Sequence, residues 1–237
     1  MKRKIRCGGK PMTAIVLAGG RGLRMKADKA GLPVGGRTLL EHVLGQLEPH
    51  FSEILISVSP GQKIRFAAGR TVEDGIPGQG PLGGILAGLK AAASDACAVV
   101  ACDIPDVNIP LLRSLARAGG DAEIAVPIGP AGHFEPLFAV YRKSVVPDVE
   151  ALLQAGERSV IPLFGRCRTT VLRIEDMAWL RNLNTRMDYE SYVQSLAARQ
   201  ARSPRGGMSK GRIRTGVGTR PRKKGPGAQR PGRARRP

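Results

Sequence analysis

The sequence is poor in aromatic residues, which make up 4% of its 237 positions. So few rings do not suit a protein that binds single-stranded nucleic acid by stacking bases on aromatic side chains. Long apolar runs are also missing, since no stretch approaches the roughly 20 residues that a transmembrane helix needs. The basic start of the chain is not followed directly by the apolar segment and cleavage site of a secretory signal. We therefore expect a protein that neither crosses a membrane nor carries a secretory signal.

Cysteines are few, and no two of them are spaced as a C-x-x-C pair. The four are Cys7, Cys97, Cys102 and Cys167. Without such spacing we expect no zinc site and no disulfide framework. Two of the four lie in apolar stretches, where a cysteine behaves as a small hydrophobic residue. This usage favours the reducing cytoplasm.

Acidic residues are absent from the end of the chain. The formal net charge is +19, and fourteen of the 38 Lys and Arg residues lie from Arg199 onward, which leaves about +5 for the rest. This last segment is rich in Arg, Gly and Pro and has almost nothing to bury, so it cannot offset the entropy of ordering. We therefore divide the chain into a basic leader at 1–11, a globular domain at 12–198 and a disordered basic tail at 199–237.

The basic tail leaves open one function that is not enzymatic. Its cations would attract nucleic-acid backbones without sequence preference, and the affinity would fall as salt rises. However, the tail has no aromatic side chains, and the globular region has none of the usual recognition motifs. Nucleic-acid association is therefore the minor alternative.

In the globular region, short apolar runs alternate with segments of helical periodicity. Strands are expected at 13–19, 53–59, 70–74, 97–103, 122–128, 135–143 and 169–176, and helices at 38–49, 80–93, 107–119, 145–156 and 187–200. This alternation predicts an α/β fold in which right-handed crossovers build a mostly parallel sheet covered on both faces. Ligands of such sheets bind beyond the carboxyl ends of the strands.

The first predicted strand runs into a glycine-rich, basic loop. Its glycines include Gly19, Gly20 and Gly22, and its cations are Arg21, Arg24, Lys26 and Lys29. Glycines allow main-chain N–H groups to approach a ligand closely, and a concavity of such groups binds anions. The combination suits a triphosphate, although the loop fits neither G-x-G-x-x-G nor the P-loop pattern. The alternative is an ordinary turn with a solvated basic surface.

Two aspartates are expected at the same edge of the sheet. Asp103 ends the apolar run "CAVVACD", and one or two carboxylates together with phosphate oxygens suit Mg²⁺. The alternative for Asp103 is a cap before Ile104–Pro105. Asp74 lies in "VEDGIPGQGPLGG", which on its own is more typical of a flexible surface loop.

Six separated motifs occur in one order between Thr13 and Tyr192: "LAGGRGLRMKADKAGLPVGGRTLLEHV", "EDGIPGQGPLGGI", "ACDIPD", "EPLFAVY", "LLQAGERSV" and "NLNT". Together they make this part of the chain similar to the molybdenum cofactor guanylyltransferase family. The resemblance implies a Rossmann-like three-layer fold of the nucleotidyltransferase type. It also implies transfer of GMP from GTP to molybdenum-loaded molybdopterin, with Mg²⁺ as cofactor and pyrophosphate as the leaving group.

The resemblance further implies roles for individual residues. Arg24, Lys29 and Asp103 would be catalytic, and Asp103 would also hold the metal. The nucleotide would be bound by Leu17, Ala18, Gly19, Gly20, Lys29, Asp74 and Asp103, and the pterin by Asn182 and Asn184. Arg158 would either approach the pterin phosphate or remain solvated. We assign no role to His42, His50 or His133.

The chain departs from the family pattern at three places. Lys26 replaces a glycine after Met25, Arg186 stands where a proline is usual, and Ser57 lies near a common asparagine. Lys26 could add a phosphate contact but cannot follow a glycine-only backbone path. The missing proline removes a cue for the start of the last helix.

Rival activities share the same fold. Related enzymes transfer CMP to the same pterin, and others act on sugar phosphates. Proteins that deliver molybdopterin and molybdoenzymes that accept the product are the other expected partners.

Overall fold

The computed structural model describes residues 3–19, 29–62, 69–75 and 78–202. Its centre is a seven-stranded sheet in the order β11-β9-β10-β8-β3-β6-β7. These strands are β11 (Thr169–Arg173), β9 (Ile124–Ile128), β10 (Phe138–Arg142), β8 (Ala96–Ala101), β3 (Thr13–Leu17), β6 (Glu53–Val58) and β7 (Arg70–Glu73). Neighbouring strands are parallel except at β10, which runs antiparallel to both β8 and β9. The prediction of a mostly parallel sheet is confirmed.

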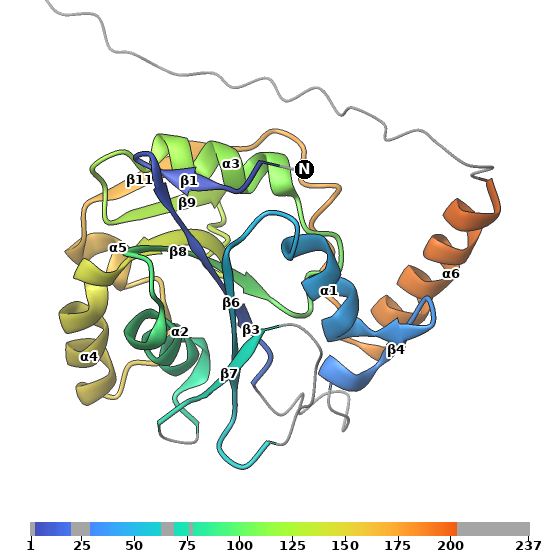
Figure 1. Cartoon of the computed structure of the whole chain (residues 1–237), viewed down its shortest axis with the longest axis horizontal. Coiled ribbons are helices and arrows are strands. Elements are labelled where there is room, and N and C mark those ends of the chain that lie inside the picture. Colours follow the sequence, from blue (N-terminus) through green and yellow to red (C-terminus); the bar gives the residue numbers. More distant parts are fainter. Residues whose placement is uncertain (1–2, 20–28, 63–68, 76–77, 203–237) are drawn as a thin grey trace, which may run out of the picture.

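Helices cover both faces of this sheet (Figure 1). One face packs against α1 (Leu39–Leu47) and α3 (Ile109–Ala118). The other packs against α2 (Gly80–Ala91), α4 (Val146–Gln154) and the short α5 (Leu163–Arg166). Successive residues of a strand point to opposite faces, and β3 accordingly divides Ala14 and Val16 from Ile15 and Leu17 between two cores. The three-layer arrangement is therefore as expected.

Local sequence signals account for where helices begin and end. At the start of α1, Thr38 N donates to Glu41 Oε2 (2.7 Å) and Glu41 N donates to Thr38 Oγ1 (3.2 Å), which forms a capping box. After α4, Gly156 takes a positive φ of 79° and so ends the helix as predicted. The predicted helices and strands are thus present, with ends shifted by a few residues.

Two short hairpins were not predicted. They pair β1 (Arg6–Cys7) with β2 (Lys10–Pro11), and β4 (Pro33–Val34) with β5 (Arg37–Thr38). Each turn is a Gly-Gly pair with φ between 56° and 82°, the conformation that a tight hairpin requires.

The first hairpin joins the leader to the core. Ile5 and Cys7 are buried, and Ile5 N donates to His50 O (2.8 Å). The described part of the basic leader, residues 3–11, therefore packs against the globular domain from which its charge had separated it.

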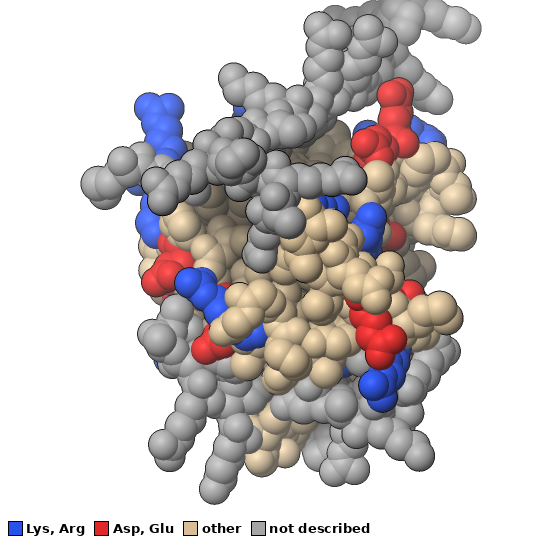
Figure 2. All heavy atoms as spheres, turned by 90° about the vertical axis from the view of Figure 1, so that its right-hand side faces the viewer, with Lys and Arg blue, Asp and Glu red and all other residues tan. Residues whose placement is uncertain are grey.

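The last helix, α6 (Arg186–Arg202), extends beyond residue 198. It packs through Tyr192 against Val34 and Leu39, at the right of Figure 1. The expectation of disorder in the tail lies outside the described residues from 203 onward. On the face shown in Figure 2, basic and acidic side chains of the described residues are interspersed rather than separated by sign.

Two further findings concern the chain as a whole. In the part of the chain that the structure describes, no helix is both long enough and apolar enough to cross a membrane. All four cysteines are buried and free of disulfide bonds.

Candidate active site

The strands β3 and β8 lie side by side and end at the same edge of the sheet. Their last pair is Leu17 with Ala101, and Cys102 N donates to Leu17 O (3.0 Å). The chain that follows each strand, toward Gly19 in one case and Asp103 in the other, therefore leaves from one place. This confirms that the glycine loop begins at the edge where Asp103 follows β8, while residues 20–28 of the loop lie outside the described residues.

Three of the predicted site residues converge there. Lys29, in the short 3₁₀ turn Lys29–Gly31, places its Nζ 3.3 Å from Asp103 Oδ2 and 3.3 Å from Asn184 Oδ1. The Lys29 and Asp103 side chains are 16% and 25% exposed. Leu183 N donates to Asp103 O (2.9 Å), which fixes the segment carrying Asn184 to the segment carrying Asp103. A cation, a carboxylate and an amide oxygen thus meet where a ligand can reach them.

Asn182 does not join this cluster. Its side chain is exposed, and its carbonyl accepts a hydrogen bond from Asn184 N (2.9 Å). The segment continues into α6, where Thr185 N donates to Asp188 Oδ2 (2.8 Å) and Asp188 N to Thr185 Oγ1 (3.1 Å). This reciprocal cap starts the helix without the missing proline, because it satisfies main-chain donors that would otherwise lack partners.

A second polar pair lies on the other side of β3. Ser57, 1% exposed at the end of β6, donates from Oγ to Asp74 Oδ1 (2.5 Å). Burial raises the pKa of the half-buried Asp74 carboxyl above its ordinary value, and the hydrogen bond from Ser57 opposes that rise. The Ser57 carbonyl accepts from Ala18 N and Gly19 N, both at 2.9 Å. Ser57 therefore ties Asp74 to the start of the glycine loop, a role that we did not expect from the sequence.

The hydrogen bonds of Ser57 also limit how this loop can meet a nucleotide. The N–H groups of Ala18 and Gly19 are already engaged by the Ser57 carbonyl. Leu17 and Ala18 are 8% and 4% exposed, so their side chains face the core. Of the other loop residues, Gly20, Arg24 and Lys26 lie outside the described residues.

Glycines let α2 approach these residues closely. A Cβ on Gly84 of α2 would lie 2.7 Å from Ser57 Oγ and 3.1 Å from Leu17 Cδ2. The start of the glycine loop is packed as closely, since a Cβ on Gly19 would lie 3.0 Å from Ser59 N. Only a residue without a side chain fits such separations. At the start of α2, Gly80 has φ +64° and faces the main chain of Arg158, whose side chain is exposed. The motifs "GPLGG" and "LLQAGERSV" are therefore neighbours in space.

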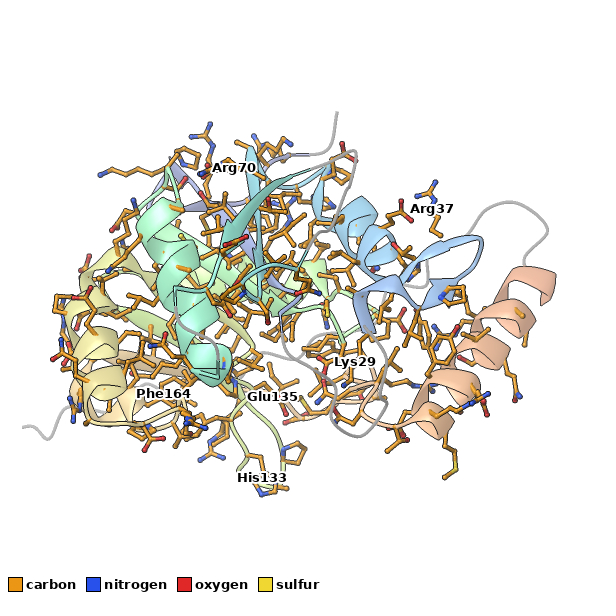
Figure 3. All side chains as sticks on the ribbon, turned by 90° about the horizontal axis from the view of Figure 1, so that it is seen from below. Lys29, Arg37, Arg70, His133, Glu135 and Phe164 are labelled. Atoms are coloured by element: carbon orange, nitrogen blue, oxygen red, sulfur yellow. The ribbon has the colours of Figure 1, made fainter. Side chains whose placement is uncertain are left out.

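The motif "EPLFAVY" brings another acid to the same edge. Glu135 is half-buried just before β10, and burial raises the pKa of its carboxyl, an effect that the charge of His133 partly opposes. Figure 3 shows Glu135 and Lys29 on the lower side of the molecule, with His133 farther out on the β9–β10 loop. Its motif alone predicts no chemistry for Glu135, because the same residues also describe an ordinary strand.

The other two histidines have partners outside this cluster. His42 Nε2 lies 3.1 Å from the hydroxyl of Tyr192, and His50 Nδ1 lies 3.1 Å from the guanidinium of Arg113. Burial lowers the pKa of His42 below 6.5.

The oxygens of Asp103 and Asn184 are ligands that suit a hard cation such as Mg²⁺. Within the described ranges no three His, Cys, Asp or Glu side chains form a metal-binding group. Any metal here would therefore need oxygens from a phosphate substrate or from water, as Mg²⁺ commonly does.

Comparisons with known proteins identify the family of the chain. The MobA-like NTP transferase domain matches residues 14–168. A probable molybdenum cofactor guanylyltransferase of Carboxydothermus hydrogenoformans is 32% identical over 196 residues, covering 80% of this chain and 98% of the relative. The counterpart from Pelotomaculum thermopropionicum is 36% identical over 171 residues, covering 72% and 83%.

Solved structures agree on the fold. The crystal structure of molybdopterin-guanine dinucleotide biosynthesis protein A from Archaeoglobus fulgidus superposes with a TM-score of 0.69 at 24% identity, covering 79% of this chain and all of that one. A cytidylyltransferase for 2-C-methyl-D-erythritol 4-phosphate from Thermus thermophilus superposes at 0.61 with 20% identity, covering 79% and 99%. The chain belongs to the family of MobA-like NTP transferases.

Proposed function

We propose that this protein transfers GMP from GTP to molybdenum-loaded molybdopterin and releases pyrophosphate. The observation that carries the proposal is the meeting of Lys29, Asp103 and Asn184 at the edge where the glycine loop begins. The curated relatives, named molybdenum cofactor guanylyltransferases, support the choice of both substrates.

The two substrates would enter from opposite sides of the β3–β8 junction. The nucleotide would lie over β3 and β6, where Ser57 and Asp74 are joined. Its phosphates would extend toward Lys29 and Asp103, and the acceptor would approach from the side of Asn184. Arg24 of the glycine loop, and the main chain at Leu17, Ala18, Gly19 and Gly20, remain proposed nucleotide contacts.

The chemistry needs position and charge rather than a side-chain nucleophile. A terminal phosphate oxygen of molybdopterin attacks the α-phosphorus of GTP in line. A bond from that oxygen to the phosphorus forms as the bond to the β-phosphate oxygen breaks, and pyrophosphate carries away the electron pair. The attacking phosphate is already an anion, so the protein must bring two anions together. Lys29 lies where it can neutralise part of this charge.

Asp103 is the residue proposed to hold a divalent metal, and Mg²⁺ is the proposed ion. The fit is supported by its carboxylate, its 25% exposure and the neighbouring Asn184 oxygen. When bound, the metal would neutralise negative charge on the phosphates. Lys29 would then exchange its ion pair with Asp103 for a contact with phosphate.

The test is pyrophosphate release with molybdenum-loaded molybdopterin as acceptor, measured with GTP and separately with CTP, with and without Mg²⁺. Asp103→Asn should abolish release because it removes the charge that holds the metal. Asp121→Asn is the matched control, because Asp121 is exposed and precedes β9 at the opposite edge. Release with CTP alone would show that the nucleotide substrate is CTP rather than GTP. No release with either nucleotide would refute the proposal.

The proposed setting is the cytoplasm, because four cysteines without disulfide bonds suit a reducing compartment. Proteins that deliver molybdopterin and molybdoenzymes that receive the product are the proposed partners. Deleting residues 203–237 should leave pyrophosphate release unchanged if the basic tail has no part in the reaction. Lost release would implicate the tail.

A further inference from the structure

Glu135 lies at the candidate site although its motif was explained as a strand. The strand β10 begins at the edge where β8 ends, because the two run antiparallel with Phe138 opposite Val100 and Arg142 opposite Ala96. Ala101 N donates to Leu137 O (2.9 Å), so the contact continues beyond these pairs. The chain turns just before β10, and Glu135 N donates to Pro127 O (3.0 Å) near the end of β9. Glu135 therefore lies at the edge of the sheet where β8 and β9 end, the edge that Asp103 follows.

The backbone that carries Glu135 is held firmly. Glu135 N donates to Pro127 O (3.0 Å), and Phe138 N donates to Glu135 O (3.1 Å). The preceding residue, Phe134, packs edge-on against Phe164 with ring centroids 5.1 Å apart. In Figure 3, Glu135 lies between Phe164 and Lys29. The backbone at Glu135 is therefore fixed before any ligand arrives.

The Glu135 carboxylate differs from carboxylates with structural roles in this chain. Glu157 accepts hydrogen bonds from two main-chain N–H groups, and Glu123 accepts from Arg168 N and the Ser144 hydroxyl. Among the described residues, none donates a hydrogen bond to the Glu135 carboxylate, although it is half-buried. A carboxylate taken out of water without donors is unfavourable unless a ligand supplies them.

The donors that suit a carboxylate are two parallel N–H groups. Both proposed substrates carry such a pair, because guanine and pterin share the ring N–H and neighbouring amino group of a 2-amino-4-oxopyrimidine. Chemistry alone therefore leaves two candidates for Glu135.

The order of the strands decides between them. Asp74 is bound to Ser57 of β6, whereas Glu135 precedes β10, and β3 and β8 lie between these two strands. Three spacings of about 4.8 Å separate β6 from β10 by about 14 Å. One base cannot reach both acids, so a nucleotide placed on Asp74 leaves Glu135 to the other substrate.

We propose that Glu135 binds the 2-amino-4-oxopyrimidine edge of the pterin and so selects the acceptor. This inference rests on the proposed function for the identity of the acceptor. It adds a residue that recognises the pterin ring of the acceptor, whereas the proposed metal and phosphate contacts do not distinguish one acceptor from another.

The experiment measures binding rather than turnover. Fluorescence titrations with 6-hydroxymethylpterin and with 6-hydroxymethyllumazine, which has an oxo group in place of the amino group, would be made on the wild type and on Glu135→Gln. The wild type should prefer the pterin. Glu135→Gln should bind the pterin about 10- to 100-fold more weakly and lose the preference, because an amide can donate to the lumazine oxo group. Glu135→Asp should keep the preference at reduced affinity.

Glu175→Gln is the matched control and should change neither titration. Glu175 is exposed and follows β11, the edge strand farthest from β7. Titration with GTP and ITP, which lacks the guanine amino group, separates the two substrates. GTP affinity should be unchanged in Glu135→Gln, and a selective loss of GTP binding would assign Glu135 to guanine instead.

The inference and the proposed function fail in different ways. No pterin binding by the wild type, or equal binding by Glu135→Gln, overturns the inference even if pyrophosphate release is normal. Pterin preference that depends on Glu135, without guanylyl transfer, supports the inference and overturns the proposed function. Equal thermal transitions for all variants would show that folding does not explain the differences.

Discussion

Lys29 and Asp103 form an ion pair with Nζ 3.3 Å from Oδ2, although 74 positions separate them in the chain. The pair is partly open to solvent, so its contribution to the free energy of unfolding should be small, about 0–1 kcal/mol. Under the proposed function, the pair keeps both groups at one place where phosphates would replace the internal contact. The site is thus arranged for exchange of partners.

The first prediction concerns Lys29. Lys29→Met should lower the rate of pyrophosphate release by about 10²–10³-fold, because it removes a positive charge at the proposed phosphate position. The thermal unfolding midpoint should change little. Arg37→Met serves as control, since Arg37 is exposed on β5 and lies far from Lys29 in Figure 3. Equal rates for the two variants would remove Lys29 from the catalytic residues.

The second prediction concerns the pair Ser57 and Asp74. Ser57→Ala should lower the free energy of unfolding by about 1–3 kcal/mol, because it leaves a half-buried carboxylate without its hydroxyl donor. It should also weaken GTP binding, which Asp74→Asn should weaken as well. A double-mutant cycle measures their coupling. Additive effects of the two substitutions on GTP binding would mean that Ser57 does not act through Asp74.

The third prediction concerns His42 and pH. Burial lowers its pKa in the folded protein below 6.5, while the charge of Asp106 raises it in part and that of Arg37 lowers it further. The unfolded chain therefore binds more protons than the folded one just below pH 6.5, and the free energy of unfolding should fall as pH decreases through that range. His42→Gln should reduce this dependence between about pH 7.5 and about pH 5.5. Denaturant titrations at both pH values would give the change in the free energy of unfolding for the wild type and for His42→Gln. An equal change in the two proteins would contradict the prediction.

The fourth prediction concerns the packing of α2 on the sheet. A Cβ on Gly88 would lie 2.6 Å from Ile15 Cγ2, so Gly88→Ala should destabilise the protein by about 1–3 kcal/mol through overpacking. Gly165, in α5, has nothing within 4 Å of such a Cβ. Gly165→Ala should therefore be neutral or stabilise by up to about 1 kcal/mol. Chemical denaturation of both variants tests the contrast, which would fail if Gly88→Ala were as stable as the wild type.

Much of the fold follows from the sequence, because apolar periodicity locates strands and helices whatever their partners. The alternation of elements also predicted that β3 and β8 would meet, which placed Asp103 beside the glycine loop. Periodicity carries no strand direction, however, and the reversal of β10 is what brings Glu135 to the site. That reversal could be seen only in the pairing of Phe138 with Val100.

Side-chain partners were harder to predict than elements. The resemblance implied Lys29 and Asn184 as site residues, but not their contact. Ser57 looked like a departure from a family pattern, and its link to Asp74 depends on how β7 is placed beside β6. The two hairpins depend on Gly-Gly pairs with positive φ, but such pairs also occur in ordinary loops and do not by themselves predict a hairpin.

The contact between Lys29 and Asn184 spans 155 positions of the chain. During synthesis, β3, β8 and Asp103 are complete long before Asn184 leaves the ribosome, because Asn184 follows every strand of the sheet. A nascent chain can therefore assemble the proposed nucleotide side of the site first and the proposed acceptor side last. Such late closure makes long-range contacts slow to form. A chain that ended between Arg173 and Asn184 would contain all seven strands of the sheet but lack the contact of Asn184 with Lys29.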